Sequence, residues 1–293
     1  MRRFVQTLSF FLVSFSLSSF AAAQGDSCQT FRVANSEVTI DVVIDGETYP
    51  AALTMSNIPG TITLELVRKL GLNEQVDRRS TVIGDFGRPE AKRFITNLDI
   101  GLFGTTTTAK QMTIAGRGQA ISLSLRLFQD LLIQMDFPNS RICFFDRDAV
   151  NMKEVHNIEM DFDPQFGVPV VKVRFNDEID TWLQVSPGLG AGIRLDSVIA
   201  EELGLYESAT SASSLLLSNT FDLMQLGPYE VGQMSAQFPR LGVNDNIKTN
   251  SQSKVGTNIK RGKESRGRIG LEILKHFVVT MDMKTGRMHI YTP

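Results

Sequence analysis

Two stretches of the sequence have the form of an apolar strand that enters a tight turn, where side chains could meet a ligand. The first stretch covers residues 51–63 and the second covers residues 183–190. The turn positions are Met55, Ser56 and Asn57 in the first stretch and Ser186, Pro187 and Gly188 in the second. The Ser186 hydroxyl could act as a nucleophile only beside an activating base and an oxyanion site. The thioether of Met55 offers no useful proton chemistry, so neither turn by itself predicts catalysis.

Residues that usually supply a base or hold a metal are sparse. The three histidines are His156, His276 and His289, and none of them lies near Ser186 in the sequence. They are too scattered for a zinc cluster, and the two cysteines lack metal-type spacing. We therefore expect neither a metal nor any other cofactor.

The first residues have the pattern of a secretory signal peptide, from a basic start at Arg2 and Arg3 through an apolar, Ser-rich run to small residues at 21–23. An uncleaved membrane anchor is the alternative, although the run is barely long enough to span a bilayer. The 293-residue chain is 42% hydrophobic and 21% charged with a net charge of −2, which is typical of a globular protein and does not indicate nucleic-acid binding. We expect an exported protein, periplasmic or secreted.

Export bears on the two cysteines, Cys28 and Cys143. Because exported proteins meet oxidising conditions, a single disulfide between them is one interpretation. The other is that Cys143 is a buried strand residue and that Cys28 lies in a loose N-terminal segment.

An internal repeat organises the chain. Residues 270–288 match residues 124–142 at a constant offset of 146. Both segments read as a short helix, a strand that ends in Met-Asp, a turn, and a further strand that begins with Arg. The chain is therefore expected to be two copies of one unit.

The front of each half repeats as well. Residues 38–46 form an alternating strand with an Asp-Gly hairpin turn, and residues 169–177 match them at an offset of 131 with an Asn-Asp turn. At this offset Met55 falls on Ser186. Short strands dominate, with one brief helix after each turn stretch and another before the last strands. This pattern predicts an all-β fold with two barrel-like lobes of six or seven strands.

The increase in offset from 131 to 146 places about fifteen extra residues in the second copy, between 242 and 268. This stretch is polar and strongly basic, with cations at Lys248, Lys254, Lys260, Arg261, Lys263, Arg266 and Arg268. A solvated loop is the simpler interpretation. The alternative is that residues 244–268 bind an anionic surface, such as membrane lipid.

The hairpin, the turn, the short helices and the Met-Asp strand follow one another in the same order in both halves. This order, present twice, resembles that of the retropepsin-like and pepsin-like aspartic peptidases, above all exported bacterial members with two lobes on one chain. The resemblance covers residues 35–292. It implies two β-barrel lobes around a central cleft, with a projecting flap at Gly84, Asp85, Phe86 and Gly87. The implied organisation is a signal peptide at 1–23, an N-terminal segment at 24–34, a first lobe at 35–147, a linker at 148–154 and a second lobe at 155–292.

In that family each turn reads Asp-Thr/Ser-Gly, and the two carboxylates share a proton so that one acts as base and the other as acid. Met55 and Ser186 stand at the two Asp positions of the resemblance. A glycine beside the second turn is kept as Gly270, whereas the first half has Ser124 there. The acids that could replace the dyad are Asp45, Asp196, Asp136 and Asp282. The first two do not precede Ser/Thr-Gly, and the last two match each other at a position that is structural in the family.

Three functions remain open at this point. The favoured one is an inactive peptidase homologue that binds a peptide or protein in the cleft, because both acids are replaced. The second is an exported aspartic-type endopeptidase with a non-standard active site, for which the fold and Ser186 are the only motivation. The third is a structural or assembly protein of the cell envelope that acts through the basic stretch.

Overall fold

The structure is a computed structural model that describes residues 28–34, 37–55, 58–83, 89–116, 118–164, 166–243 and 262–293. Some of the features expected from the sequence lie outside these residues. They are the signal peptide at 1–23, the turn residues Ser56 and Asn57, the flap residues Gly84, Asp85, Phe86 and Gly87, and positions 244–261 of the basic stretch.

The first lobe is built on an eight-stranded sheet in the order β2-β3-β4-β9-β5-β8-β7-β6. Its strands are β2 (Arg32–Ala34), β3 (Glu37–Ile44), β4 (Glu47–Thr54), β5 (Gly60–Thr63), β6 (Gln75–Ile83), β7 (Pro89–Leu102), β8 (Thr105–Ala115) and β9 (Ile121–Ser124), with helix α1 (Leu64–Lys69) after β5. A further pairing between β3 and β7 closes six of these strands into a barrel.

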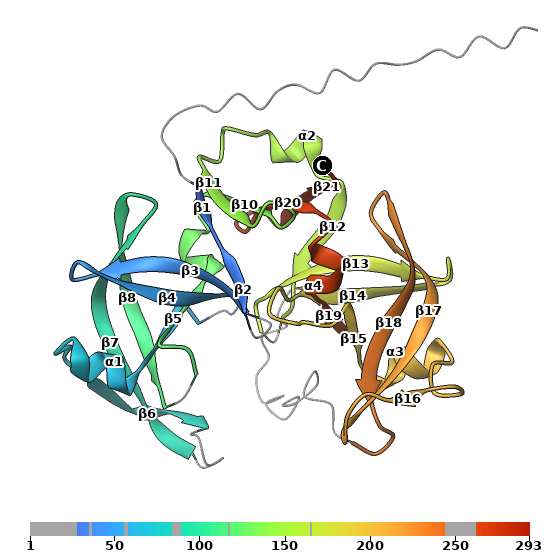
Figure 1. The fold of residues 1–293 in the computed structure, drawn as a ribbon, viewed down its shortest axis with the longest axis horizontal. Helices are drawn as coiled ribbons and strands as arrows, with labels where there is room; N and C mark the ends of the chain where they lie inside the picture. Colours follow the sequence, from blue (N-terminus) through green and yellow to red (C-terminus); the bar gives the residue numbers. More distant parts are fainter. Residues whose placement is uncertain are drawn as a thin grey trace, which may run out of the picture.

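The second lobe repeats this plan (Figure 1). Its strands are β13 (Pro169–Phe175), β14 (Ile179–Val185), β15 (Ile193–Leu195), β16 (Thr210–Ser211), β17 (Leu216–Leu226), β18 (Tyr229–Pro239) and β19 (Gly267–Ile269), with helix α3 (Ser197–Glu202) after β15. A pairing between β13 and β17 closes the equivalent six strands. The two barrel-like lobes expected from the sequence are therefore present.

Alternating apolar residues build both barrels. Along β3, for example, Val38, Ile40, Val42 and Ile44 are all buried, because successive side chains of a strand point to opposite faces. Each such side chain contributes about 1.5–3 kcal/mol when it is fully buried. The core on which the two turns rest is therefore a continuous apolar one.

Six strands at one end of a thirteen-stranded sheet join the two halves, in the order β1-β11-β10-β20-β21-β12; this joining sheet continues into the second lobe through the pairing of β12 with β13. Its strands are β1 (Cys28–Thr30), β10 (Leu132–Asp136), β11 (Arg141–Phe145), β12 (Ile158–Phe162), β20 (Val278–Asp282) and β21 (Arg287–Tyr291). Three short helices flank it, namely η1 (Leu125–Phe128), α2 (Met152–Val155) and α4 (Leu271–Leu274). Each half therefore contributes the strand that ends in Met-Asp and the strand that follows it.

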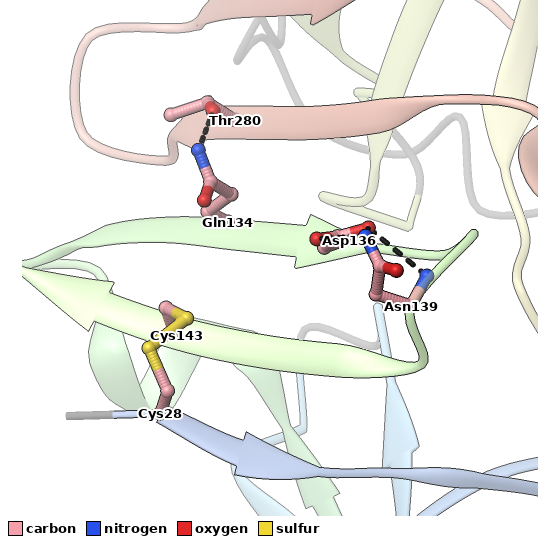
Figure 2. Close-up of a disulfide and its surroundings, with 6 residues drawn as sticks. All are labelled: Cys28, Gln134, Asp136, Asn139, Cys143 and Thr280. Atoms are coloured by element: carbon pink, nitrogen blue, oxygen red, sulfur yellow. Dashed lines mark hydrogen bonds between the residues drawn. A yellow bond between two sulfur atoms is a disulfide. The ribbon is translucent and has the colours of Figure 1, made fainter. Parts of the chain in front are cut away.

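The repeat is visible at the centre of this sheet. Strands β10 and β20 are antiparallel, and the middle pair of their ladder is Gln134 and Thr280. The Gln134 side-chain amide donates a hydrogen bond to the Thr280 hydroxyl at 3.0 Å (Figure 2). These two residues are 146 positions apart, which is the offset of the repeat. An approximate two-fold axis therefore passes between them.

A disulfide joins Cys28 of β1 to Cys143 of β11 (Figure 2). The bridge that the sequence left open is thus present, and the segment before the first lobe is not loose at this point. Its strand β1 pairs with β11 at the edge of the joining sheet, and its strand β2 pairs with β3 of the first lobe.

Candidate functional site

Each of the two turns lies where a strand ends between two neighbours. Strand β9 runs parallel to β4 and antiparallel to β5. In the second half, β19 runs parallel to β14 and antiparallel to β15. Strands β4 and β5, and strands β14 and β15, therefore each flank a strand inserted from further along the chain.

The ladders correct the alignment of the two turns. In the first hairpin Thr39 pairs with Ala52, and in the second Val170 pairs with Gln184. The offset is 131 before the hairpin turn and 132 after it. The extra residue lies in the turn itself, where residues 176–178 separate β13 from β14 and only residues 45–46 separate β3 from β4. The expected match of Met55 with Ser186 is therefore wrong by one residue.

The counterpart of Ser186 is Thr54. Viewed from the inserted strands, Leu53 pairs with Leu123 and Val185 pairs with Ile269, so the next residues, Thr54 and Ser186, are equivalent.

The burial sequence agrees with this assignment. Residues 51–53 are buried, Thr54 is half-buried and Met55 is buried again; residues 183–185 are buried, Ser186 is half-buried and Pro187 is buried again. With only 7% of its surface exposed, Met55 belongs to the core cluster rather than to a ligand site.

Equivalent backbone hydrogen bonds hold the two turns. In the first half, the Ser124 amide donates to the Pro59 carbonyl at 2.9 Å. In the second, the Gly270 amide donates to the Gly192 carbonyl at 2.8 Å. A Cβ on Gly270 would lie 1.9 Å from the carbonyl oxygen of Ala191, so no side chain fits there.

The first half has a side chain at this position because its turn is shorter. Residues 55–59 connect β4 to β5, whereas residues 186–192 connect β14 to β15. The Ser124 side chain is fully buried, and its hydroxyl accepts a hydrogen bond from the Arg126 amide at 3.1 Å, which caps η1.

The second turn is closed by its own backbone. The Ser186 amide donates to the Ile269 carbonyl and the Leu189 amide donates to the Ser186 carbonyl, each at 2.9 Å. Pro187 is buried and Gly188 is exposed at the tip. Within the described residues, no hydrogen bond joins the Ser186 side chain to a histidine. His156 and His289 each have Nδ1 against a backbone carbonyl instead.

The acids nearest to the turns in the sequence have structural roles. Asp45 has a positive φ of 50° in the β3–β4 turn. Asp196 is fully buried, caps α3 by accepting a hydrogen bond from the Ile199 amide at 2.9 Å, and lies 3.3 Å from Arg266. Neither residue follows β4 or β14.

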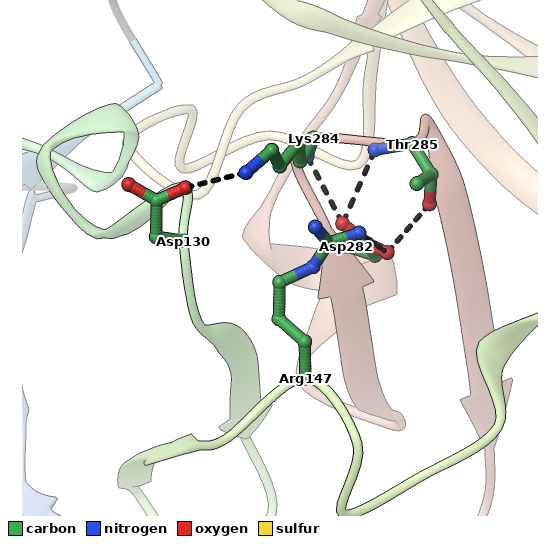
Figure 3. Close-up of polar contacts among 5 residues, drawn as sticks. All are labelled: Asp130, Arg147, Asp282, Lys284 and Thr285. Carbon is green, nitrogen blue, oxygen red and sulfur yellow. Dashed lines mark hydrogen bonds and ion pairs between the residues drawn. The ribbon is translucent and has the colours of Figure 1, made fainter.

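The two Met-Asp acids lie in the joining sheet. Asp136 accepts hydrogen bonds from the backbone and side-chain nitrogens of Asn139. Asp282 is 3% exposed and accepts from Thr285 and Arg147 (Figure 3). Burial raises the pKa of Asp282, but the hydrogen bonds from Thr285 and Arg147 outweigh burial, so the pKa lies below its ordinary value. Both aspartates hold turns.

No group of three or more His, Cys, Asp or Glu side chains in the described ranges is arranged to hold a metal ion. No helix in the same ranges is long and apolar enough to cross a membrane.

Comparison with known proteins identifies the fold. No protein-family model matches the chain, and no curated protein sequence matches it. Among solved structures, an aspartic proteinase from Irpex lacteus is similar with a TM-score of 0.54 and 10% identity, over 90% of this chain and 96% of that one. Basic 7S globulin from soybean is similar with a TM-score of 0.51 and 10% identity, over 91% and 95%. The fold is thus the two-lobed, all-β fold of the pepsin-like aspartic proteinases.

Proposed function

We propose that this exported protein has the aspartic-proteinase fold without the chemistry, and that it binds an extended peptide between its lobes. The observation that carries the proposal is the pair Thr54 and Ser186. These residues are equivalent in the two ladders, each is half-buried at the end of its strand, and both are hydroxyls. We infer that they hold the positions of the two family carboxylates.

Two hydroxyls cannot take the general-acid and general-base roles of a carboxylate pair. A dyad functions because two neighbouring acids share one proton, so that one is a base and the other an acid at the same pH. Threonine and serine hydroxyls stay neutral at any working pH. They do donate and accept hydrogen bonds, so they can hold the backbone of a peptide that they do not cleave.

The lobes also offer strand edges to an extended peptide. Strand β6 pairs only with β7 and ends the sheet of the first lobe. An edge strand presents unpaired N–H and C=O groups along one side, to which a peptide can add as a further strand. The β6–β7 hairpin is the one expected to project as the flap.

A peptide-binding experiment tests the proposal directly. Purified protein is titrated with a library of extended peptides by calorimetry, and the best binder is measured again with the double variant Thr54→Val/Ser186→Ala. Loss of the two hydroxyls is expected to weaken binding about thirtyfold, because each hydrogen bond contributes about 1 kcal/mol. The matched control is Thr106→Val/Ser214→Ala, which removes two exposed hydroxyls elsewhere. Equal affinity in both double variants, or no binder, would contradict the proposal.

A peptidase assay separates binding from catalysis. We expect no cleavage by the wild type between about pH 3 and pH 8, the range in which an acid dyad or a serine nucleophile would act. The variant Thr54→Asp/Ser186→Asp restores the carboxylates, whereas Met55→Asp/Ser186→Asp buries one of them in the core. Acid-dependent cleavage by the first variant alone would support the assignment. Wild-type cleavage that is lost in Ser186→Ala would establish the alternative, a peptidase with a non-standard site.

A further inference from the structure

A cavity of about 480 Å³ lies on the second half, over the strands where the joining sheet meets the second lobe. Its lining comes from β12, β13, β14 and β21 and from the described end of the basic stretch. Neither Thr54 nor Ser186 contributes to it. The cavity includes Trp182, which is the only tryptophan of the chain. It is therefore a second site, separate from the pair of turns.

Two cations in this cavity have no acidic partner among the described residues. The Lys263 ammonium lies 5.6 Å from the centroid of the Trp182 ring, and Arg287 pairs across the ladder with Glu159 of β12 without an ion pair. Lys172, in contrast, is already bound to Asp180 at 3.0 Å and lies 3.7 Å from Glu159. The cavity thus holds uncommitted positive charge beside an aromatic ring.

The repeat shows that the fold does not require these residues. Lys172 and Trp182 are partners across β13 and β14. Their counterparts across β3 and β4, at offsets of 131 and 132, are Asp41 and Pro50. Asp41 forms an ion pair with Arg32 at 2.5 Å. The same hairpin therefore forms with a proline in place of the tryptophan, so the fold does not require the aromatic ring of the second half.

We propose that this cavity binds a sugar acid, such as a uronic acid residue of an anionic glycan. The apolar indole face can pack against the C–H groups on one face of a sugar ring, and the Lys263 and Arg287 cations suit a carboxylate. The carboxylates of Glu159 and Asp161, which also line the cavity, can accept hydrogen bonds from the ring hydroxyls. A ligand that has both an anionic group and hydroxyl donors can bind the cations and the carboxylates of the cavity at once. The cavity volume lies within the range for small-molecule sites.

Because Trp182 is the only tryptophan, its fluorescence reports on this cavity alone. The probe is trigalacturonate, and its fully methyl-esterified form is the neutral match with the same rings. We expect saturable quenching by trigalacturonate and at least about tenfold weaker binding of the ester, because the ester lacks the negative charge that strengthens hydrogen bonds from Lys263 and Arg287. No fluorescence change and no heat in calorimetry at millimolar probe, or equal binding of acid and ester, would overturn the proposal.

Charge-removing variants locate the bound carboxylate. Arg287→Gln and Lys263→Gln are each expected to weaken trigalacturonate binding about tenfold, and Trp182→Phe, measured by calorimetry, to weaken it by a similar factor. Lys110→Gln removes an exposed cation of the first lobe and is expected to change nothing. If Lys110→Gln weakened binding as much as Lys263→Gln, the attraction would be diffuse and the site would be rejected. Thr54→Val/Ser186→Ala should leave this binding intact, so failure here is distinct from failure of the peptide site.

Discussion

The two Met-Asp turns of the joining sheet occupy equivalent places, but they are held by different contacts. In the first half, the Asp136 carboxylate accepts hydrogen bonds from Asn139 of its own turn and from no other described residue. In the second half, the Asp282 carboxylate accepts from the amides of Lys284 and Thr285 and from the Thr285 hydroxyl. It also accepts from Arg147 at 2.7 Å, a residue that follows the last strand of the first half.

The second turn therefore does more than its counterpart. It closes a hairpin and also ties the two halves together, and Lys284 adds a further ion pair across the halves to Asp130 at 2.9 Å (Figure 3). The two copies therefore share the backbone fold of this turn, but only the second copy also uses the turn to hold the two halves together. The predictions below test this division.

The largest effect is expected at the position where the halves hold Ser124 and Gly270. Gly270→Ala would place a Cβ 1.9 Å from the Ala191 carbonyl oxygen, which no side-chain rotation can relieve, so we expect a loss of at least about 4 kcal/mol in the free energy of unfolding or no folded protein. Ser124→Ala removes the hydroxyl that caps η1, which costs about 1 kcal/mol. Denaturant unfolding followed by Trp182 fluorescence measures both. Similar costs for the two substitutions would show that the second turn is not the tighter one.

The next effect concerns the two end strands of the joining sheet, β1 and β12, of which only β1 is a sheet edge among the described strands. Strand β12 is paired on both sides, with β13 and β21, whereas β1 pairs only with β11 and is tied by the Cys28–Cys143 disulfide. Because the bridge spans 115 residues, Cys28→Ser/Cys143→Ser is expected to cost about 4 kcal/mol. Hydrogen exchange should then show faster exchange in β1 and unchanged protection in β12. Unchanged protection in both strands would mean that the ladder alone holds β1.

A smaller effect separates the two aspartates. Asp282→Asn removes a buried carboxylate that accepts hydrogen bonds from both halves, which we expect to cost about 2–3 kcal/mol. Asp136→Asn alters a local turn bond and should cost about 0.5–1 kcal/mol. Urea unfolding of the matched pair measures the difference. Equal costs would mean that the tie through Arg147 contributes nothing beyond the turn itself.

The smallest effect is a change in pH dependence. The folded-state pKa of Asp282 lies below its ordinary value, so its stabilisation is fully present above the unfolded pKa of about 4 and is lost as the pH falls through the folded value. The stability difference between wild type and Asp282→Asn should therefore shrink as the pH falls below about 4. Arg147→Gln, which removes one donor to the carboxylate, should reduce that shrinkage. A difference that stays constant down to about pH 2 would contradict the assignment.

Much of the fold could be predicted because the repeat is long and its markers are unusual. The offset of 146 between the Met-Asp segments reappears as the pairing of Gln134 with Thr280, and the alternating residues of β3 indicated its buried face. The shared sheet itself could not be predicted. A repeat shows which strands are equivalent, but it does not show that strands from different halves pair with each other.

The alignment of the two turns was predicted to within one residue, and the reason for the error is local. The sequence at 176–177 reads as a two-residue Asn-Asp turn, and both residues do have positive φ, at 48° and 59°. The turn nevertheless includes Glu178, whose amide donates to the Phe175 carbonyl at 3.0 Å. One added residue moves every later position by one and exchanges a core side chain for a half-exposed one. Turn length is decided by the closing hydrogen bond, which the residue types alone do not reveal.

The pairing of β10 with β20 has a consequence for how the chain folds. During synthesis, β10 is complete long before β20 exists. The edge of β10 that will pair with β20 therefore stays unpaired while almost the whole second half is made. Contacts between residues so distant in the sequence form slowly because a large loop must close first. Since β10 and β20 are copies of one strand, two unfinished chains could also pair through their β10 edges. Among crowded nascent chains, pairing of β10 with β20 of the same chain would therefore compete with pairing of β10 with a neighbouring chain. The order of synthesis thus affects which pairing forms.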